Sequence, residues 1–216
     1  MTQQIEKTIK ALEKNNMKAY CVKNKQDVLP LLESLIDKDS LIAVGGSETL
    51  KETGVIQKLQ SGEYNFLDRY ENGLNGQQIM NVLHKTALAD VFLSSSNAVT
   101  QNGELYNVDG TSNRIAAICF GPKKVILVVG ANKIVKDLKE AEIRVKTVAA
   151  PKNAQRLHHK TPCFESGECV SLKFPEHSMC DGCRISERIC SNYLVCGYQQ
   201  EPGRITVIIC EESLGY

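Results

Sequence analysis

The sequence predicts an α/β fold in which a mainly parallel sheet is flanked by helices, with a cysteine-rich segment near the C-terminus. Apolar runs alternate with helical patterns along most of the chain, as expected for strands joined by crossover helices. The stretch KKVILVVG at 123–130 is apolar on both faces, which is typical of a buried parallel strand. Five of the nine cysteines fall between 163 and 190, so the last quarter differs from the body before it.

The first half of the chain contains two helix–strand units and a glycine turn. Apolar residues at helical spacing predict helices over 2–16 and 26–37. Short apolar runs predict strands at 17–22 and 41–46, and the second run ends in two glycines. Ser47 follows those glycines and is a suitable N-cap for the next helix. A buried strand therefore ends here in a tight turn.

The second half continues the alternation. Helical patterns occupy 76–88 and 133–141, and strand patterns occupy 89–96 and 203–210. The resulting division is an α/β body, a cysteine-rich segment, and a closing strand and tail of the same domain, at 1–157, 158–196 and 197–216.

Length and composition are those of an ordinary soluble domain. With 216 residues, of which 42% are hydrophobic and 24% charged, the chain buries a core without disulfides. A net charge of +1 gives no electrostatic reason for a nucleic acid or membrane partner. No apolar run approaches the roughly 20 residues of a membrane span, and the charged N-terminus lacks a secretory signal. We therefore expect a cytoplasmic protein, a monomer or a homodimer, with reduced thiols.

The glycine turn is the first candidate binding site. Gly45 and Gly46 allow an anion to approach the backbone, and Ser47 and Thr49 supply hydroxyl groups next to a helix start. The turn is neither a dinucleotide-binding nor a P-loop motif. A plain strand-to-helix turn is the equally open alternative.

The polar stretch at 94–114 is the second candidate. It follows a predicted strand, and α/β sheets bind ligands at the carboxyl ends of their strands. Its candidate ligand contacts are Asn97, Thr100, Gln101, Asp109, Asn113 and Arg114. Arg114 is suited to hold a carboxylate or phosphate through two hydrogen bonds. The alternative is a solvated hairpin in which Arg114 forms a surface salt bridge.

The cysteine segment is the third candidate. Cys180 and Cys183 form a short chelate loop, and Cys163, Cys169 and Cys190 lie near them in the sequence. Four thiolates bind either zinc or an iron–sulfur cluster, so five cysteines leave one spare. Reduced or redox-active thiols are the alternative. The histidines of this region, His158, His159 and His177, are expected at the surface.

Several of these motifs together resemble the lactate-utilisation (LUD-domain) family, and more closely its stand-alone bacterial branch. The resemblance lies in NAVTQNGELYNVDGTSNRIAAICFGPKKVILVVGANKIV, followed by AAPKNAQRL, TPC, ERIC and the closing ESLGY. It implies a fold similar to ribose-5-phosphate isomerase and the CoA transferases. Some members of the family belong to systems that oxidise lactate together with iron–sulfur partner proteins.

The resemblance also bears on individual residues. The turn at Gly45 matches the family's early glycine turn, which in related folds lies near the anionic group of the ligand. Gln101 stands where CoA transferases often have a nucleophilic glutamate, and an amide cannot form the acyl anhydride. The family's usual cysteine run looks like C-x5-C-x2-C-x6-C, whereas here VSLKFPEHSM separates Cys169 from Cys180. The resemblance thus implies a [4Fe–4S] cluster with Cys169 as a competing ligand. The four expected ligands are Cys163, Cys180, Cys183 and Cys190.

The predicted function is iron–sulfur redox or electron transfer in the metabolism of small organic acids, with a redox partner protein. The first alternative is a zinc-stabilised, non-redox protein that binds an organic anion or a sugar phosphate. The second is an isomerase or transferase that uses the same pocket. The sequence assigns no catalytic residue, so enzymatic activity stays open.

Overall fold

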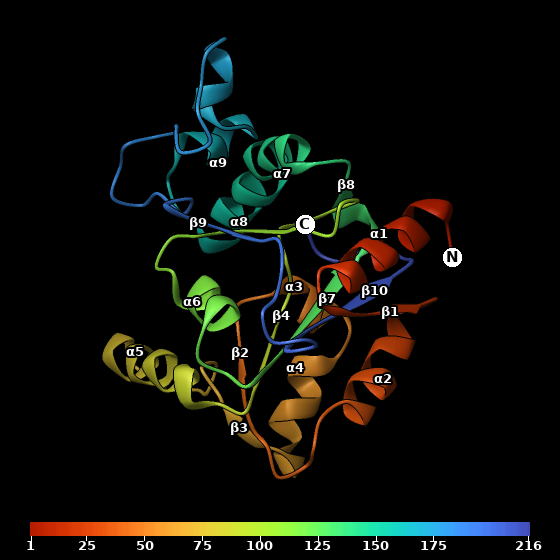
Figure 1. Cartoon of the computed structure of the whole chain (residues 1–216). Coiled ribbons are helices and arrows are strands. Elements are labelled where there is room, and N and C mark those ends of the chain that lie inside the picture. Colours follow the sequence, from red (N-terminus) through yellow and green to blue (C-terminus); the bar gives the residue numbers. More distant parts are fainter.

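A computed structural model describes all 216 residues and has a six-stranded parallel sheet at its centre (Figure 1). In spatial order the strands are β1 (Lys18–Val22), β10 (Ile205–Cys210), β7 (Lys124–Gly130), β4 (Val91–Ser94), β2 (Leu41–Val44) and β3 (Asn65–Leu67). All neighbouring strands are parallel. The last strand of the chain lies between β1 and β7, inside the sheet. The predicted α/β class with a mainly parallel sheet is confirmed.

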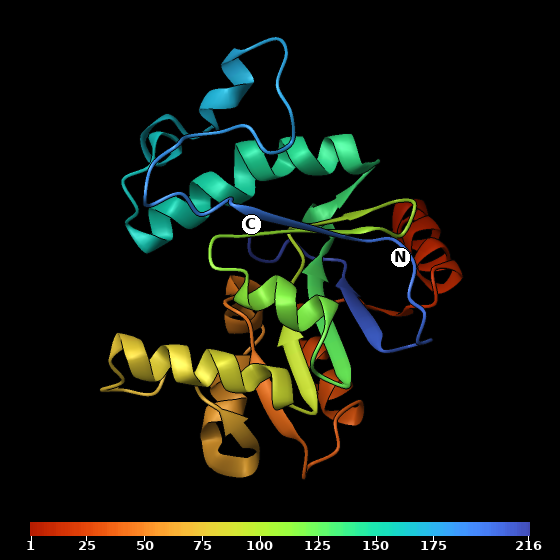
Figure 2. The ribbon, with the colours of Figure 1, turned by 60° about the vertical axis from the view of Figure 1, so that its left-hand side comes forward.

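Helices cover both faces of this sheet. One face is covered by α2 (Val28–Ser34), α3 (Glu48–Glu52) and α4 (Val55–Lys58), and the other by α1 (Gln3–Lys14) and α6 (Asn113–Cys119). The helix α5 (Gly76–Lys85) buries none of its residues and projects from the body in Figure 2. The side chain of Ser47 accepts a hydrogen bond from the Leu50 amide at 3.2 Å, so its predicted role as N-cap is confirmed.

A second, four-stranded sheet lies over the first and was not predicted. Its strands are β8 (Ile134–Val135), β5 (Ala98–Thr100), β6 (Leu105–Asp109) and β9 (Asn192–Cys196), in that order. β5 and β6 form an antiparallel hairpin from the polar stretch, and β9 comes from the end of the cysteine-rich segment. Every residue of β5 and β6 is buried. The expected alternative of a solvated hairpin is therefore wrong.

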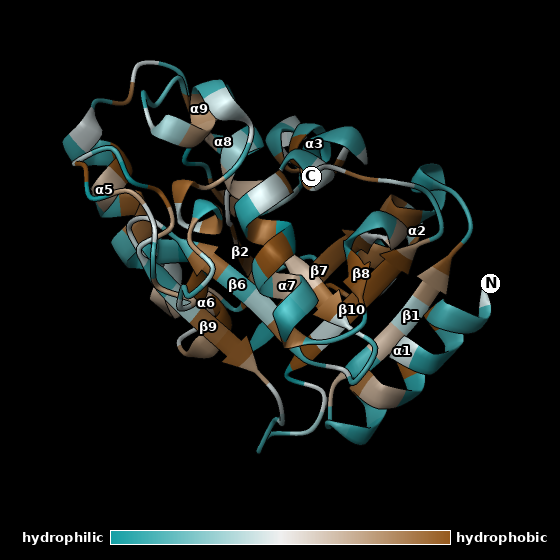
Figure 3. Ribbon diagram, turned by 90° about the horizontal axis from the view of Figure 1, so that it is seen from above, coloured by the Kyte–Doolittle hydropathy of each residue, from teal (hydrophilic) through white to brown (hydrophobic).

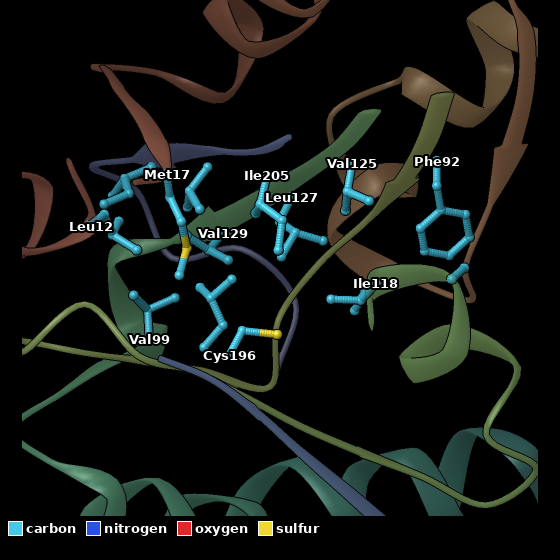
Figure 4. Packing of buried hydrophobic residues seen from close by; sticks show 14 of the residues in the cluster. Leu12, Met17, Phe92, Val99, Ile118, Val125, Leu127, Val129, Cys196 and Ile205 are labelled. Carbon is cyan, nitrogen blue, oxygen red and sulfur yellow. The ribbon is translucent and has the colours of Figure 1, made fainter. Parts of the chain in front are cut away.

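β5 and β6 are buried on both faces, whereas β9 at the edge of the small sheet is partly exposed, so this sheet lies between the large sheet and a further layer of helices. Val99 belongs to the buried cluster that contains Leu127 and Ile205 of the large sheet (Figure 4), and Leu105 is a member of the same cluster. Their neighbours, among them Tyr106, face the helices on the other side. This alternation follows from the two-residue period of a strand. In Figure 3, apolar colouring gathers on β7 and β10, the strands covered on both faces.

The outer layer is one continuous helical segment, made of α7 (Leu138–Arg144), the π-helical turn η5 (Val145–Ala149) and α8 (Ala150–Leu157). The helix expected over 133–141 begins only at Leu138, because the residues before it form η4 (Ala131–Lys133) and β8, which pairs with β5. The cysteine-rich segment follows with α9 (Pro162–Ser166) and the turn η6 (Val170–Lys173), on the outer side of these helices (Figures 1 and 2).

Candidate functional site

A cleft of about 490 Å³ opens at the carboxyl ends of β2, β4 and β7. Three adjacent parallel strands end here, which is the usual ligand position in an α/β sheet. Most of its lining is polar. Of the residues predicted from the sequence, those that line it are Gly46, Ser47, Asn97, Asp109, Asn113 and Arg114. The fold thus brings the glycine turn and one end of the polar stretch together.

Arg114 supports the cleft and is not free to hold a ligand. Its side chain is 11% exposed and pairs with Asp109 at 2.7 Å. It also donates to the side chains of Asn97 and Asn107 and to the carbonyls of Ser95 and Val108. Arg114 was expected to hold an anion through two hydrogen bonds. This expectation is corrected, because the guanidinium already donates its hydrogen bonds to these protein groups. The alternative of a surface salt bridge is also wrong, because the pair is buried.

The glycine turn packs closely instead of forming an open cradle. A β-carbon on Gly45 would lie 2.6 Å from Ser94 Oγ, whereas one on Gly46 would meet nothing within 4 Å. The oxygen of Ser47 is engaged as the N-cap, and α3 has only five residues. Glu48 of its first turn lines the cleft as well. Of the turn, only Gly46 offers open backbone.

Thr100 and Gln101 lie away from the cleft, at the opposite end of the hairpin, and their expected role as ligand contacts needs correction. The Gln101 side chain accepts a hydrogen bond from Lys7 Nζ at 3.2 Å, and Thr100 bonds to Glu104. Gly103, between these strands, touches the backbone of α1 at Ala11. The reason is that an extended strand advances about 3.3 Å per residue, so Asn97 and Thr100 end up at opposite ends of β5.

Lys133 is a buried cation of the cleft that the sequence did not indicate. Its side chain is 3% exposed, lines the cleft, and donates to Thr49 Oγ1 at 2.9 Å and Ser95 Oγ at 3.0 Å. Burial, together with the nearby charges of Arg144 and Arg114, lowers the pKa of Lys133 to about 7. Thr49, itself a predicted site residue, reaches the cleft only through this lysine. The position of Lys133 just after a buried parallel strand was the available signal.

The charges of the cleft favour an anion. Its basic residues are Arg69, Arg114, Lys133, Arg156 and Arg188, and its acidic residues are Glu48, Asp109 and Glu187. Asp109 is already paired with an arginine, and Glu48 lies 3.5 Å from Arg156. The basic groups therefore exceed the acidic ones where a ligand would enter.

A second, much smaller cavity of about 20 Å³ lies where the cysteine-rich segment packs against β6 and the helical segment α7–η5–α8. Four thiols surround it, those of Cys163, Cys169, Cys183 and Cys190. Cys180 is exposed and does not line it, because a turn closed by hydrogen bonds between Ser178 and Asp181 holds it outside. Cys169, expected to compete for a place among the ligands, therefore lies at the cavity together with Cys163, and Cys180 is the cysteine that lies outside.

The surroundings of this cavity are mostly apolar, with a few polar groups. Burial raises the pKa of the Cys183 and Cys190 thiols. Lys146 lies in the wall, paired with Glu142 at 2.8 Å, and the buried hydroxyl of Tyr106 has no hydrogen-bond partner. As folded, no group of three or more His, Cys, Asp or Glu side chains has the geometry of a metal site.

One arginine connects the cavity with the cleft. Arg188 lines the cleft, and its guanidinium donates to the carbonyls of Cys180, Cys183 and Cys190 at 2.6–3.1 Å. The segment 186–191 therefore forms a wall with the cleft on one side and the thiols on the other. Of the histidines, His159 lines the cleft, with Nδ1 3.1 Å from the Glu187 carbonyl.

No helix of the protein is both long and apolar enough to span a bilayer.

The family model of the LUD domain matches residues 5–210. A solved structure of a DUF162 family protein from Deinococcus radiodurans is similar to this chain, with 14% identity and a TM-score of 0.50. The similarity covers 96% of this chain and 93% of that one. No curated protein matches the chain. The match over nearly the whole sequence shows that this chain belongs to the LUD-domain family, which is associated with lactate utilisation.

Proposed function

We propose that this protein carries a [4Fe–4S] cluster on the thiolates of its cysteine-rich segment and binds a small organic acid in the adjacent cleft. The observation that carries the proposal is the meeting of four thiols at one cavity, directly behind a wall of the cleft. The ligands in this proposal are Cys163, Cys169, Cys183 and Cys190. A cluster bound there would supply one-electron transfer.

The chemistry of the cavity is suited to such a group. Thiolates prefer iron–sulfur clusters, zinc and copper(I) over hard cations. The Tyr106 hydroxyl is buried and free to donate to a sulfur atom, and Lys146 adds a positive charge to the wall. Hydrogen bonds and charges of this kind tune the potential of a cluster. In this reading the protein acts with a redox partner protein.

Zinc is the second candidate, and the size of the cavity favours it. A volume of about 20 Å³ is room for about one atom of the size of a water molecule. A [4Fe–4S] cluster is larger than this space, whereas a single ion is not. With zinc, the protein is a non-redox binder of an organic anion.

In the cleft, the residues themselves supply recognition. Lys133 provides an amine without a carboxylate partner, and Ser95 and Ser96 line the cleft near it. The association of the family with lactate utilisation supports a small carboxylate as the ligand. Arg114 then acts indirectly, by fixing the hairpin end that forms the floor.

The metal proposal is tested on protein purified without oxygen, by elemental analysis for iron, sulfide and zinc and by absorption and EPR spectra. Iron with stoichiometric sulfide supports the cluster, and stoichiometric zinc alone supports the second candidate. Metal-free protein that takes up neither group on reconstitution contradicts both.

Cysteine variants then identify the ligands. We expect Cys169→Ser and Cys183→Ser to lose most of the bound metal. Cys180→Ser should keep it, as should Cys119→Ser, which alters an exposed thiol outside the segment. If Cys180→Ser lost the metal and Cys169→Ser kept it, the ligands would be the four cysteines expected from the sequence.

The anion proposal is tested by calorimetry with lactate on the whole protein. Binding that is lost in Lys133→Met and retained in Lys123→Met, a change at an exposed lysine, supports it. Binding that is equal in the two variants would place the ligand elsewhere.

A further inference from the structure

We propose that Lys133 is a nucleophile that forms an imine with a small carbonyl compound bearing an acidic group. The inference rests on the proposed function, since it uses the same cleft and the same preference for anions. It adds a covalent step and narrows the ligand to a compound with a ketone or aldehyde carbonyl.

The first argument is the position of the amine. Lys133 is 3% exposed, yet it is one of the residues that line the cleft. Its two hydrogen-bond partners are the hydroxyls of Thr49 and Ser95. Thr49 in turn donates to the Leu214 carbonyl at 3.3 Å, which fixes that hydroxyl from the other side. The amine is therefore held in place by neutral groups.

The second argument is a comparison with the other buried cations. Arg114 pairs with Asp109, and Lys146 pairs with Glu142. Arg144 donates to two backbone carbonyls. Lys133 has neither a carboxylate nor a carbonyl acceptor among its hydrogen bonds. Burial of a charged amine without such partners is unfavourable, so the site favours the neutral, nucleophilic form.

Most of the electrostatic surroundings act in the same direction, since burial, Arg144 and Arg114 lower the pKa of Lys133 and Glu52 has a smaller, opposite effect. With a pKa of about 7, about half of the Lys133 amines are neutral at pH 7, against fewer than about one in a thousand for an ordinary lysine. Desolvation and neighbouring cations are the two means by which proteins activate a lysine for imine formation. Both are present here, the cations being Arg114 and Arg144.

The step is balanced without any further reactant. The Nζ lone pair forms a bond to the carbonyl carbon, and the π electrons of the C=O bond move to oxygen. One amine proton passes to that oxygen, with the Ser95 hydroxyl close enough to carry it, and a carbinolamine results. A proton from solvent allows the hydroxyl to leave as water, so that a protonated imine remains. Addition of water reverses the sequence and releases the carbonyl compound.

The test uses the whole protein, with pyruvate as probe and lactate as its matched analogue without a carbonyl group. Borohydride delivers a hydride to the imine carbon and fixes the adduct as a secondary amine. We expect one reduced pyruvyl adduct per chain, located on Lys133 by peptide mapping, and its loss when lactate is present in excess. Labelling spread over exposed lysines, without enrichment at Lys133, would overturn the inference.

Variants at two lysines, together with lactate binding by the wild type, separate this inference from the proposed function. Lys133→Arg cannot form an imine, so the adduct at this position should disappear. Lys123→Arg changes an exposed lysine and should label like the wild type. Lactate binding without any adduct in the wild type would overturn the imine alone. Absence of both lactate binding and the adduct would contradict the anion site as well.

Discussion

The cleft and the thiol cavity share one wall but differ in how their polar groups are satisfied. In the cleft, Arg114 and Asp109 satisfy each other, and the space that remains is large and polar. In the cavity, four thiols and a tyrosine hydroxyl face a small, mostly apolar space. The first suits a soluble ligand that enters and leaves, and the second suits a group that stays. Each region is braced by one arginine, Arg114 in the cleft and Arg188 behind the thiols.

The largest expected effect is the loss of stability on removal of Arg114, the arginine that supports the cleft. Arg114→Ala leaves Asp109 buried without its partner, which costs about 3–5 kcal/mol of unfolding free energy. Urea unfolding measures this loss. Lys123→Ala breaks an exposed pair with Asp90 and should change little. Equal losses in the two variants would mean that the burial of Arg114 contributes nothing.

The next effect is the pH dependence caused by Lys133. Because its pKa is lowered to about 7, the folded state is penalised whenever the amine is charged in the unfolded chain. The penalty is fully present below about pH 7 and vanishes as pH rises toward the ordinary lysine value. Lys133→Met removes it, so we expect this variant to be more stable than the wild type by roughly 2–5 kcal/mol near neutral pH.

This difference in unfolding free energy should shrink between about pH 6 and about pH 9.5. The charged groups around the amine are Arg114, Arg144 and Glu52, and all of them are retained in the variant. A difference that stays constant with pH would mean that Lys133 is charged in the folded protein.

Removal of Arg188, which holds the cysteine-bearing loop, should lower the affinity for the metal. Arg188→Gln loses the hydrogen bonds to three carbonyls of the cysteine-bearing loop. Groups that orient metal ligands in this way contribute about 10–100-fold in affinity. Competition with a chelator measures the change, and Arg184→Gln, at an exposed position of the same loop, is the matched control. Reduced affinity in both variants would point to charge and not to the brace.

The smallest expected effect is a difference in stability between alanine variants of the two glycines of the turn. Gly45→Ala places a methyl group against Ser94 and the Arg114 side chain, so we expect a loss of about 1–3 kcal/mol. Gly46→Ala meets open space and should stay within about 0.5 kcal/mol of the wild type. Thermal unfolding of the pair measures both. A greater loss in Gly46→Ala would contradict the packing described for the turn.

The sequence by itself determined the parts that depend on local pattern. The apolar run at 123–130 contains β7, the alternation of strands and helices forms a parallel sheet, and Ser47 is an N-cap. These features follow from periodicity and capping, which act over a few residues. The grouping of cysteines near the C-terminus was likewise visible as a pattern.

Only the tertiary structure decided which of these residues meet. The second sheet joins strands from distant parts of the chain, so no local pattern indicates it. Its hairpin moved Thr100 and Gln101 away from the cleft, and a turn left Cys180 outside the thiol cavity in favour of Cys169. Lys133 is an ordinary residue in sequence. Its character comes from burial among hydroxyls and arginines, because desolvation and charge act through space and not along the chain.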